Sequence, residues 1–265
     1  MSRLYTEVRG SGPTLVLLHG WGLNVRVWDG LVAALCDRFR IITVDLPGHG
    51  RSGWLPDCSS LEQQAAQIHA TVAALSEEYF LLGWSLGGQL ALQLAATQTA
   101  VRRLVLIATT PRLVAAADWP HGAPPERLAA QADGLRTDYR RTVSDFLELQ
   151  VRGSAGGAAA LTQLNAALFA HGSGEGTLGP RLAALARDLE LLQDTDLRPL
   201  LAAVTVPTLV IAGQYDRVTM PAASHALADS LVDARYVELR RAAHAPFLSH
   251  LPELSSLVAD FLLRT

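Results

Sequence analysis

Gly83-Trp84-Ser85-Leu86-Gly87-Gly88 lies between an apolar run, Tyr79-Phe80-Leu81-Leu82, and a helix-like segment that covers residues 89–97. In such a G-x-S-x-G turn from a strand into a helix, the serine hydroxyl projects above the edge of the sheet, because the flanking glycines permit a very tight backbone. We therefore predict that Ser85 is a nucleophile on a sheet whose strands alternate with helices.

A nucleophilic serine needs a base, a carboxylate that orients the base, and donors for the oxyanion. Three other segments that follow strand-like runs offer these groups: His19-Gly20-Trp21-Gly22, Gly213-Gln214-Tyr215-Asp216 and Ala243-His244-Ala245-Pro246-Phe247. We predict that His244 is the general base and that Asp216 holds its imidazole in the useful tautomer. The backbone N–H groups of Trp21 and Leu86 are the expected oxyanion donors, Leu86 because it follows the nucleophile and opens a helix.

Three other aspartates compete with Asp216 for the role of the acid. Asp188, Asp194 and Asp196 precede the strand-like run that begins at Thr208, and they occupy a charged stretch. Charged stretches of this kind are typical of a solvated helix face or of helix caps. We interpret the three residues in that way and keep Asp216 as the predicted acid.

Competing interpretations also exist for the histidine and the serine. His250 follows His244 by six residues, but it directly precedes Leu251-Pro252-Glu253, so we expect it at the entry to the final helix. His19 is expected to bond the backbone near the oxyanion turn rather than to take part in the chemistry. Ser85 could be only a small residue tolerated in a glycine turn, but four matching segments favour the catalytic interpretation.

Composition fits one globular enzyme. The chain has 265 residues, a formal net charge of -3 and a pI near 6.2, so nothing indicates a nucleic-acid or basic membrane surface.

No apolar run reaches the roughly 20 residues that cross a bilayer, and the start has no apolar signal core, so we expect a cytoplasmic location. Metal-ligand spacings and nucleotide-binding glycine patterns are absent, so no metal or cofactor is expected. Without an exposed heptad or symmetric patch, we expect a monomer.

Strand-like runs alternate with helical patterns over most of the chain, and several are apolar throughout, as in parallel strands buried on both faces. These runs lie near residues 4–8, 14–18, 40–44, 79–83, 101–107, 208–212 and 235–239, and the first is expected to be antiparallel. The pattern predicts a doubly wound, mostly parallel sheet.

The alternation breaks after Pro111, where no convincing strand occurs for almost ninety residues. Helix formers dominate instead, around residues 125–132, 137–151, 155–169 and 178–193. We predict a core of residues 1–111 and 200–265 with a helical lid, residues 112–199, over the strand ends. Glycine-rich segments at 153–157 and 172–179 would be its flexible joints, and an unrelated second domain is the alternative.

The chain order Ser85, Asp216, His244 and the settings of these residues resemble the α/β hydrolase superfamily over essentially the whole chain. Asp45-Leu46-Pro47-Gly48-His49-Gly50-Arg51-Ser52 resembles a D-x-P-G-x-G-x-S loop common in that superfamily, where it shapes the pocket floor. The resemblance implies an α/β hydrolase fold: a mostly parallel eight-stranded sheet flanked by helices, with a helical lid inserted after the sixth strand.

Longer stretches resemble one group of that superfamily, the pimeloyl-ACP methyl ester carboxylesterases of biotin synthesis. These stretches are residues 17–24, 83–88 and 242–250, with shorter similarities at 118–120, 141–143, 146–150 and 195–198. The resemblance implies hydrolysis of the methyl ester of a pimeloyl chain carried on acyl carrier protein, which binds only transiently, with release of methanol. Substrate contacts then fall on Trp21, Ser85, Leu86, Phe146, Leu147, Glu148, Leu149, Gln150 and His244.

The same resemblance implies an apolar tunnel lined by Phe146, Leu147 and Leu149, although Phe146 and Leu149 could equally belong to the core of the lid. It also implies that lid arginines dock the acidic carrier. Arg141 matches one such position, and Arg140 and Arg152 lie nearby, whereas residues 155–165 contain no basic residue. Solvated surface charge is the alternative role for these arginines.

Two other functions stay open. A broad-specificity carboxylesterase, or another serine hydrolase of this superfamily acting on small free esters, would use the same three residues. A ligand receptor that retains them without useful turnover is the alternative from a different class of protein.

Overall fold

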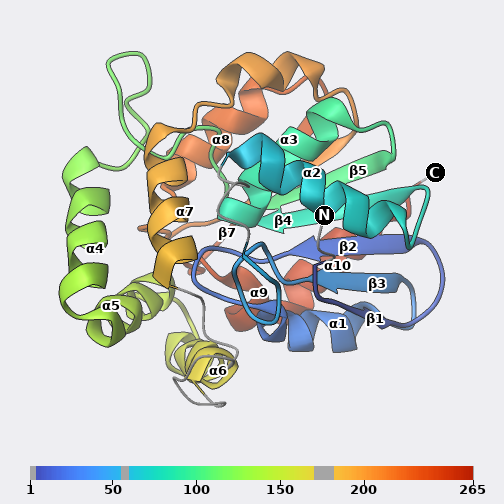
Figure 1. Cartoon of the computed structure of the whole chain (residues 1–265). Coiled ribbons are helices and arrows are strands. Elements are labelled where there is room, and N and C mark those ends of the chain that lie inside the picture. Colours follow the sequence, from blue (N-terminus) through green and yellow to red (C-terminus); the bar gives the residue numbers. More distant parts are fainter. Residues whose placement is uncertain (1–3, 55–59, 170–181, 265) are drawn as a thin grey trace.

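Seven strands form one sheet in the computed structural model, which describes residues 4–54, 60–169 and 182–264 (Figure 1). The strands lie in the order β1-β3-β2-β4-β5-β6-β7. Only β1 is antiparallel to its neighbour, with Thr6 opposite Val44. The bounds are β1 Thr6–Arg9, β2 Thr14–Leu18, β3 Arg40–Val44, β4 Tyr79–Trp84, β5 Val101–Ile107, β6 Thr208–Gly213 and β7 Ala234–Leu239.

The central strands are buried on both faces, as their apolar runs predict. Leu15, Val16, Leu17 and Leu18 of β2 are all 0% exposed. Helices α2 (Leu61–Ala73), α3 (Leu86–Thr97) and α8 (Pro221–Ser230) cover one face. Helices α1 (Asp29–Leu35), α9 (Pro246–Ser249) and α10 (Leu251–Leu262) cover the other, with the 3₁₀ helices η1 (Val25–Trp28) and η2 (Arg198–Ala203) in connections (Figure 1). The doubly wound sheet is confirmed.

The count of eight strands and the place of the insertion are wrong. Within the described residues the sheet has seven strands, and the helical insertion follows the fifth, β5. The chain offers a single strand-like segment before β2, and this segment, β1, pairs with β3. The eighth strand was implied by the resemblance alone, and no described segment of this chain supplies it.

Four helices form the insertion between β5 and β6: α4 (Pro125–Thr137), α5 (Tyr139–Val151), α6 (Gly157–Phe169) and α7 (Leu182–Asp194). They lie together beyond the end of the sheet at which Ser85 follows β4 (Figure 1). Helix α5 buries Val143, Leu147, Gln150 and Val151, a spacing that gives one buried and mostly apolar stripe. The expected joint at 172–179 lies outside the described residues.

The two chain crossings between sheet and insertion are tied together by ion pairs. Arg112, just after β5, contacts Asp196 at 2.9 Å, and Asp196 also accepts hydrogen bonds from Arg198. Arg198 reaches back to Asp118 at 3.0 Å and lies 5.7 Å from the ring centre of Trp119. These ion pairs hold the two ends of the insertion together, so the segments at 118–120 and 195–198 lie side by side.

No helix in residues 4–54, 60–169 and 182–264 is both long and apolar enough to cross a membrane.

Candidate active site

Ser85 occupies a sharp turn between β4 and α3. Its backbone has φ 56° and ψ −118°, in the positive-φ region that non-glycine residues rarely adopt. The turn is crowded, since a Cβ at Gly83 would lie 2.3 Å from the carbonyl oxygen of Gly87, and one at Gly87 would lie 2.3 Å from that of Leu18. Only glycine fits both places, which explains why the motif needs them, and the half-buried serine sits at the apex.

Asp216 and His244 form a buried hydrogen-bonded pair. His244 Nδ1 lies 2.8 Å from Asp216 Oδ2, and the residues are 1% and 4% exposed. The other carboxylate oxygen, Oδ1, accepts from the backbone N–H groups of Val218 at 2.8 Å and Thr219 at 3.0 Å. Because the carboxylate only accepts, Nδ1 carries the imidazole proton and Nε2 keeps its lone pair.

The free ring nitrogen of His244 is available for proton transfer. Its Nε2 is buried and has no hydrogen-bond partner within the described residues. The indole of Trp84, directly before Ser85, donates from Nε1 to the backbone carbonyl oxygen of His244 at 2.8 Å. Trp84 also packs against Phe247, with ring centres 4.8 Å apart. Trp84 therefore joins the turn that carries Ser85 to the loop that carries His244. The unpaired Nε2 of His244 can act as a general base.

Trp21 and Leu86 each keep a backbone N–H without an acceptor in the part of the chain that the structure describes. Leu86 is the first residue of α3, where helix geometry leaves such groups unpaired. The Trp21 side chain is committed elsewhere, because its Nε1 donates to the carbonyl oxygen of Leu185 in α7 at 3.0 Å, and its ring meets Phe146 of α5 edge-on at 5.0 Å. Unpaired N–H groups of this kind can bind a developing oxyanion.

His19 has the structural role expected of it. Its Nδ1 donates to the carbonyl oxygen of Gly20 at 2.8 Å, and its Nε2 accepts from the backbone N–H of Leu46 at 3.0 Å. Burial lowers the pKa of His19 to about 3, so the ring stays neutral near pH 7. The ring thereby holds the turn that carries Trp21.

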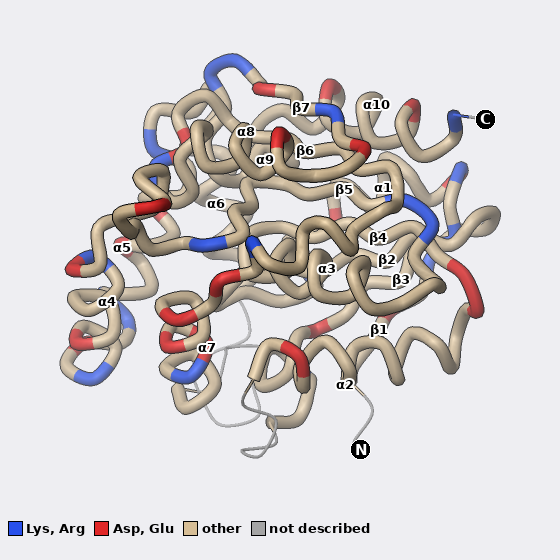
Figure 2. Tube along the Cα trace, turned by 90° about the horizontal axis from the view of Figure 1, so that it is seen from above, with Lys and Arg blue, Asp and Glu red and all other residues tan. Residues whose placement is uncertain are grey.

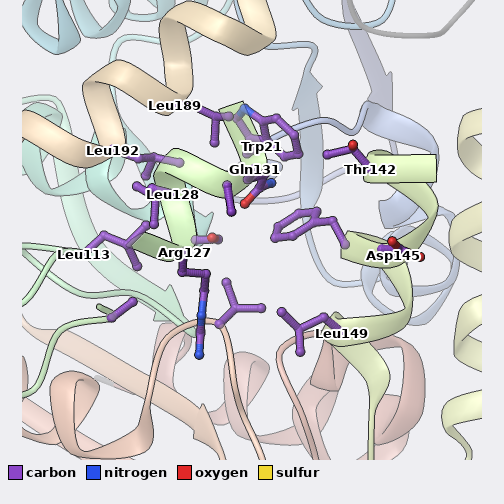
Figure 3. A pocket seen from close by; sticks show the side chains of 15 residues that line it. Trp21, Leu113, Arg127, Leu128, Gln131, Thr142, Asp145, Leu149, Leu189 and Leu192 are labelled. Carbon is purple, nitrogen blue, oxygen red and sulfur yellow. The ribbon is translucent and has the colours of Figure 1, made fainter. Parts of the chain in front are cut away.

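A cavity of about 280 Å³ opens beside Ser85, and its wall is mostly apolar (Figure 3). The insertion helices α4, α5 and α7 provide most of the lining. The lining residues are Trp21, Ser85, Leu113, Ala123, Arg127, Leu128, Ala130, Gln131, Thr142, Asp145, Phe146, Leu149, Leu189, Leu192 and Val218.

The tunnel predicted from the resemblance is only partly correct. Phe146 and Leu149 line the cavity, but Leu147 does not: it is 1% exposed and packs in the core. Glu148 is exposed and lies outside the lining, and the backbone carbonyl oxygen of Gln150 accepts from the N–H of His244 at 2.9 Å. Residues three apart on α5 share the cavity face, so the two residues between them point elsewhere.

Helices α4 and α7 also line the cavity, although no residue of either helix was predicted to do so. Arg127, Leu128 and Gln131 of α4 line the cavity, as do Leu189 and Leu192 of α7. Their spacing of three and four was the available signal, because it places them on one side of each helix. Spacing alone did not tell which side would face the cavity.

The three arginines predicted to dock a carrier lie on the surface, outside the cavity lining. Arg140, Arg141 and Arg152 are all exposed, at or near the ends of α5. Arg141 lies 3.7 Å from Asp145, one turn further along the helix, and both side chains are more than half exposed. Basic and acidic positions occur together on α4 and α5 (Figure 2), so this surface is not uniformly basic.

The interpretation of Asp188 as part of a solvated face is wrong. Asp188 is 0% exposed: its Oδ1 accepts from Gln64 Nε2 at 2.7 Å, and its Oδ2 lies 3.7 Å from His49 Nε2. Burial raises the pKa of Asp188 to about 7 and lowers that of His49 to about 4. Helix α7 turns this residue toward the core, with Ala184, Leu185 and Leu192.

The remaining competitors lie apart from the buried pair. Asp194 is exposed, and Asp196 belongs to the ion pairs at the base of the insertion. His250 precedes α10 and contacts the hydroxyl of Ser249 at 2.8 Å. Among the described residues, no group of three or more His, Cys, Asp or Glu could hold a metal ion.

Fold and site define the class: the sequence profile of the α/β hydrolase fold matches residues 13–251. The chain is 41% identical over 252 residues to a pimeloyl-[acyl-carrier protein] methyl ester esterase of Nitrosomonas europaea, which spans 94% of this chain and 95% of the relative. It is 39% identical over 259 residues to one from Xanthomonas campestris pv. campestris, 98% of each chain. The chain therefore belongs to the α/β hydrolase family that includes these esterases.

Solved structures agree on the fold. An enol-lactonase from Burkholderia xenovorans LB400 is 25% identical, with a TM-score of 0.80 over 98% of this chain and 96% of that one. An esterase from Exiguobacterium antarcticum is 21% identical, with a TM-score of 0.86 over 98% and 96% of the two chains. The second likeness concerns the fold alone.

Proposed function

We propose that this chain is a serine carboxylesterase that hydrolyses the methyl ester of pimeloyl-ACP to pimeloyl-ACP and methanol in biotin biosynthesis. The buried Asp216–His244 hydrogen bond of 2.8 Å, joined through Trp84 to the turn that holds Ser85 at positive φ, carries the proposal for the chemistry. The names of the relatives at about 40% identity support the substrate.

The first half of the reaction forms an acyl-enzyme. Ser85 Oγ attacks the ester carbonyl carbon while His244 Nε2 takes the hydroxyl proton. The backbone N–H groups of Trp21 and Leu86 hold the oxyanion, a contribution worth about a hundredfold or more in rate for each donor. His244 then gives the proton to the departing methoxide, so methanol leaves and the acyl group stays on Ser85.

Water completes the reaction by the same route. It replaces methanol beside His244, loses a proton to Nε2 and attacks the acyl carbon. When the second tetrahedral intermediate collapses, His244 returns that proton to Ser85 Oγ, and the free carboxylate is released. Asp216 stabilises the imidazolium that forms in each half and itself stays ionised.

Residues 112–199 would act as the lid of this site, over a core of residues 1–111 and 200–265. Helices α4, α5 and α7 supply most of the apolar lining, and exclusion of water strengthens the interactions around the oxyanion. All these walls come from one chain, so a monomer suffices as the working unit.

Acyl carrier protein would dock near the exposed arginines Arg140, Arg141 and Arg152. An acidic partner is attracted by such groups over distances set by ionic strength, mainly through the association rate. Because Asp145 partly neutralises Arg141, this attraction is weaker than three arginines alone would give. A transient complex suits an enzyme that must release its product.

The decisive experiment compares two substrates with purified protein. Release of methanol from pimeloyl-ACP methyl ester is measured beside free dimethyl pimelate, with the Ser85→Ala variant as blank. We expect a large preference in kcat/KM for the carrier-bound ester. Equal or faster turnover of the free ester would assign the natural substrate to small esters, and the absence of multiple turnovers on both would favour a receptor.

A further inference from the structure

Gln131 presents an amide without a partner in the wall of an otherwise mostly apolar cavity. The residue lies on α4, one turn after Arg127, and both line the cavity with Leu128 between them (Figure 3). Its Nε2 is buried and has no hydrogen-bond partner within the described residues. The Gln131 side chain makes no hydrogen bond in that part of the chain.

An unpaired amide in a cavity wall is a site for a ligand group. A buried donor without an acceptor is destabilising, whereas the same donor bonded to a ligand oxygen is not. The last torsion of glutamine is soft, so the amide can turn its donor into the cavity when an acceptor arrives. An apolar side chain would fill this wall without such a cost, which indicates that the amide serves binding.

The charges around the cavity favour a neutral acceptor. Arg127 and Asp145 both line the cavity and have opposite signs. Arg127 donates to the backbone carbonyl oxygen of Arg217, and Asp145 lies 3.7 Å from Arg141. A carboxylate ligand would lose its hydration in this mostly apolar cavity at a high cost, whereas a carbonyl oxygen of an ester, thioester or amide accepts the hydrogen bond at a lower one. Apolar lining from Leu128, Phe146 and Leu189 suits the methylene chain of such a ligand.

We propose that Gln131 determines specificity by hydrogen-bonding a second, neutral carbonyl oxygen at the end of the acyl chain remote from the ester cleaved at Ser85. The substrate class is then methyl esters of dicarboxylic chains whose far end is an ester, thioester or amide. This inference rests on the proposed function, in which the far carbonyl is the thioester to the carrier.

The test uses two neutral methyl esters of equal length. Dimethyl pimelate has the second carbonyl, and methyl 7-methoxyheptanoate replaces that carbonyl with a methylene group. For the unaltered protein we expect kcat/KM per scissile ester to be about tenfold higher for dimethyl pimelate, the value of one hydrogen bond to a neutral group. Gln131→Met should lose that factor on dimethyl pimelate, so that the two esters are cleaved with nearly equal kcat/KM.

Gln193→Met is the matched control, because Gln193 is exposed on α7 and does not line the cavity. It should keep the tenfold preference. Equal kcat/KM values for both esters in the unaltered protein, or an equal loss on both in Gln131→Met, would overturn the role of Gln131 while the serine hydrolase stands. Failure of the unaltered protein to cleave either ester would overturn the proposed function and this inference with it.

Discussion

His244 donates its backbone N–H to the carbonyl oxygen of Gln150 at 2.9 Å, so the histidine loop is anchored to the last turn of α5. The carbonyl groups of a last helical turn lack intrahelical partners and need others. Here the backbone N–H of His244 supplies a partner for the carbonyl group of Gln150. The position of the imidazole and the position of the insertion are therefore linked through a backbone hydrogen bond.

Leu147→Ala tests this link. Leu147 of α5 is 1% exposed, so its truncation leaves a cavity and should lower stability by about 2–5 kcal/mol. Because the last turn of α5 then relaxes, we expect kcat for dimethyl pimelate to fall several-fold with little change in KM. Thermal unfolding and steady-state kinetics measure both effects.

The adjacent Glu148→Ala is the control, since Glu148 is exposed and lies outside the cavity lining. It should change neither stability nor kcat noticeably. If Leu147→Ala lowers stability but keeps full kcat, the anchoring of the histidine loop does not depend on the packing of α5.

Substitution of the buried pair should separate the acid from its competitors. Asp216→Asn keeps the shape but favours the wrong tautomer of His244, so we expect kcat to fall by up to about 10⁴. Ser85→Ala should abolish ester hydrolysis with an unchanged unfolding temperature. Asp194→Asn, at an exposed position, should retain full activity. An Asp216→Asn enzyme with near-normal kcat would show that a different carboxylate serves His244.

The positions of the strands and of Ser85, Asp216 and His244 could be predicted because parallel strands place their carboxyl ends at one edge of a sheet. Ser85 and Asp216 follow β4 and β6, which are apolar and buried almost throughout, and such runs leave little choice of structure. His244 follows β7, where charged and apolar residues alternate at the edge of the sheet. The eighth strand had no such run in this chain. A fold-level likeness does not specify how many strands a member keeps.

The packing of the insertion helices could not be predicted from the sequence, for a different reason. Its helices have apolar residues on more than one side, so spacing identifies a helix but not the partner of each face. Leu147 and Leu149 look alike in sequence, yet one packs in the core and the other lines the cavity. Asp188 stands in a charged stretch, but it falls on the same helical face as Leu185 and Leu192, a signal that the net charge concealed.

Docking of the carrier predicts a substrate-dependent effect of the surface arginines. Arg141→Ala combined with Arg152→Ala should lower kcat/KM for pimeloyl-ACP methyl ester about threefold to tenfold at low salt, and less at high salt, because exposed charges act mainly on association. Dimethyl pimelate should be cleaved at the unchanged rate. Arg136→Ala, an exposed residue of α4 that pairs with Asp133, is the control. Equal losses on both substrates would point to a change in the cavity instead.

Asp188 makes the stability of the insertion depend on pH. Burial raises its pKa from 3.8 to about 7, so the folded state binds the proton more tightly than the unfolded state does. The stability gained from the protonated form is therefore complete below about pH 4 and is lost as the pH rises toward about 7. His49 titrates at about 4 and stays neutral over most of this range, while Gln64 carries no charge.

Asp188→Asn should remove that dependence, because an amide cannot ionise but can still accept the hydrogen bond from Gln64 that Oδ1 accepts now. We expect the variant to melt several degrees higher than the unaltered protein at about pH 8 and at nearly the same temperature at about pH 4, given about 2–4 °C for each kcal/mol in a chain of this size. Asp194→Asn, exposed on the same helix, should shift neither value. The two proteins could instead show melting temperatures that change with pH in parallel. That result would mean that Asp188 is ionised in the folded state throughout this range, with its charge compensated where it lies against His49.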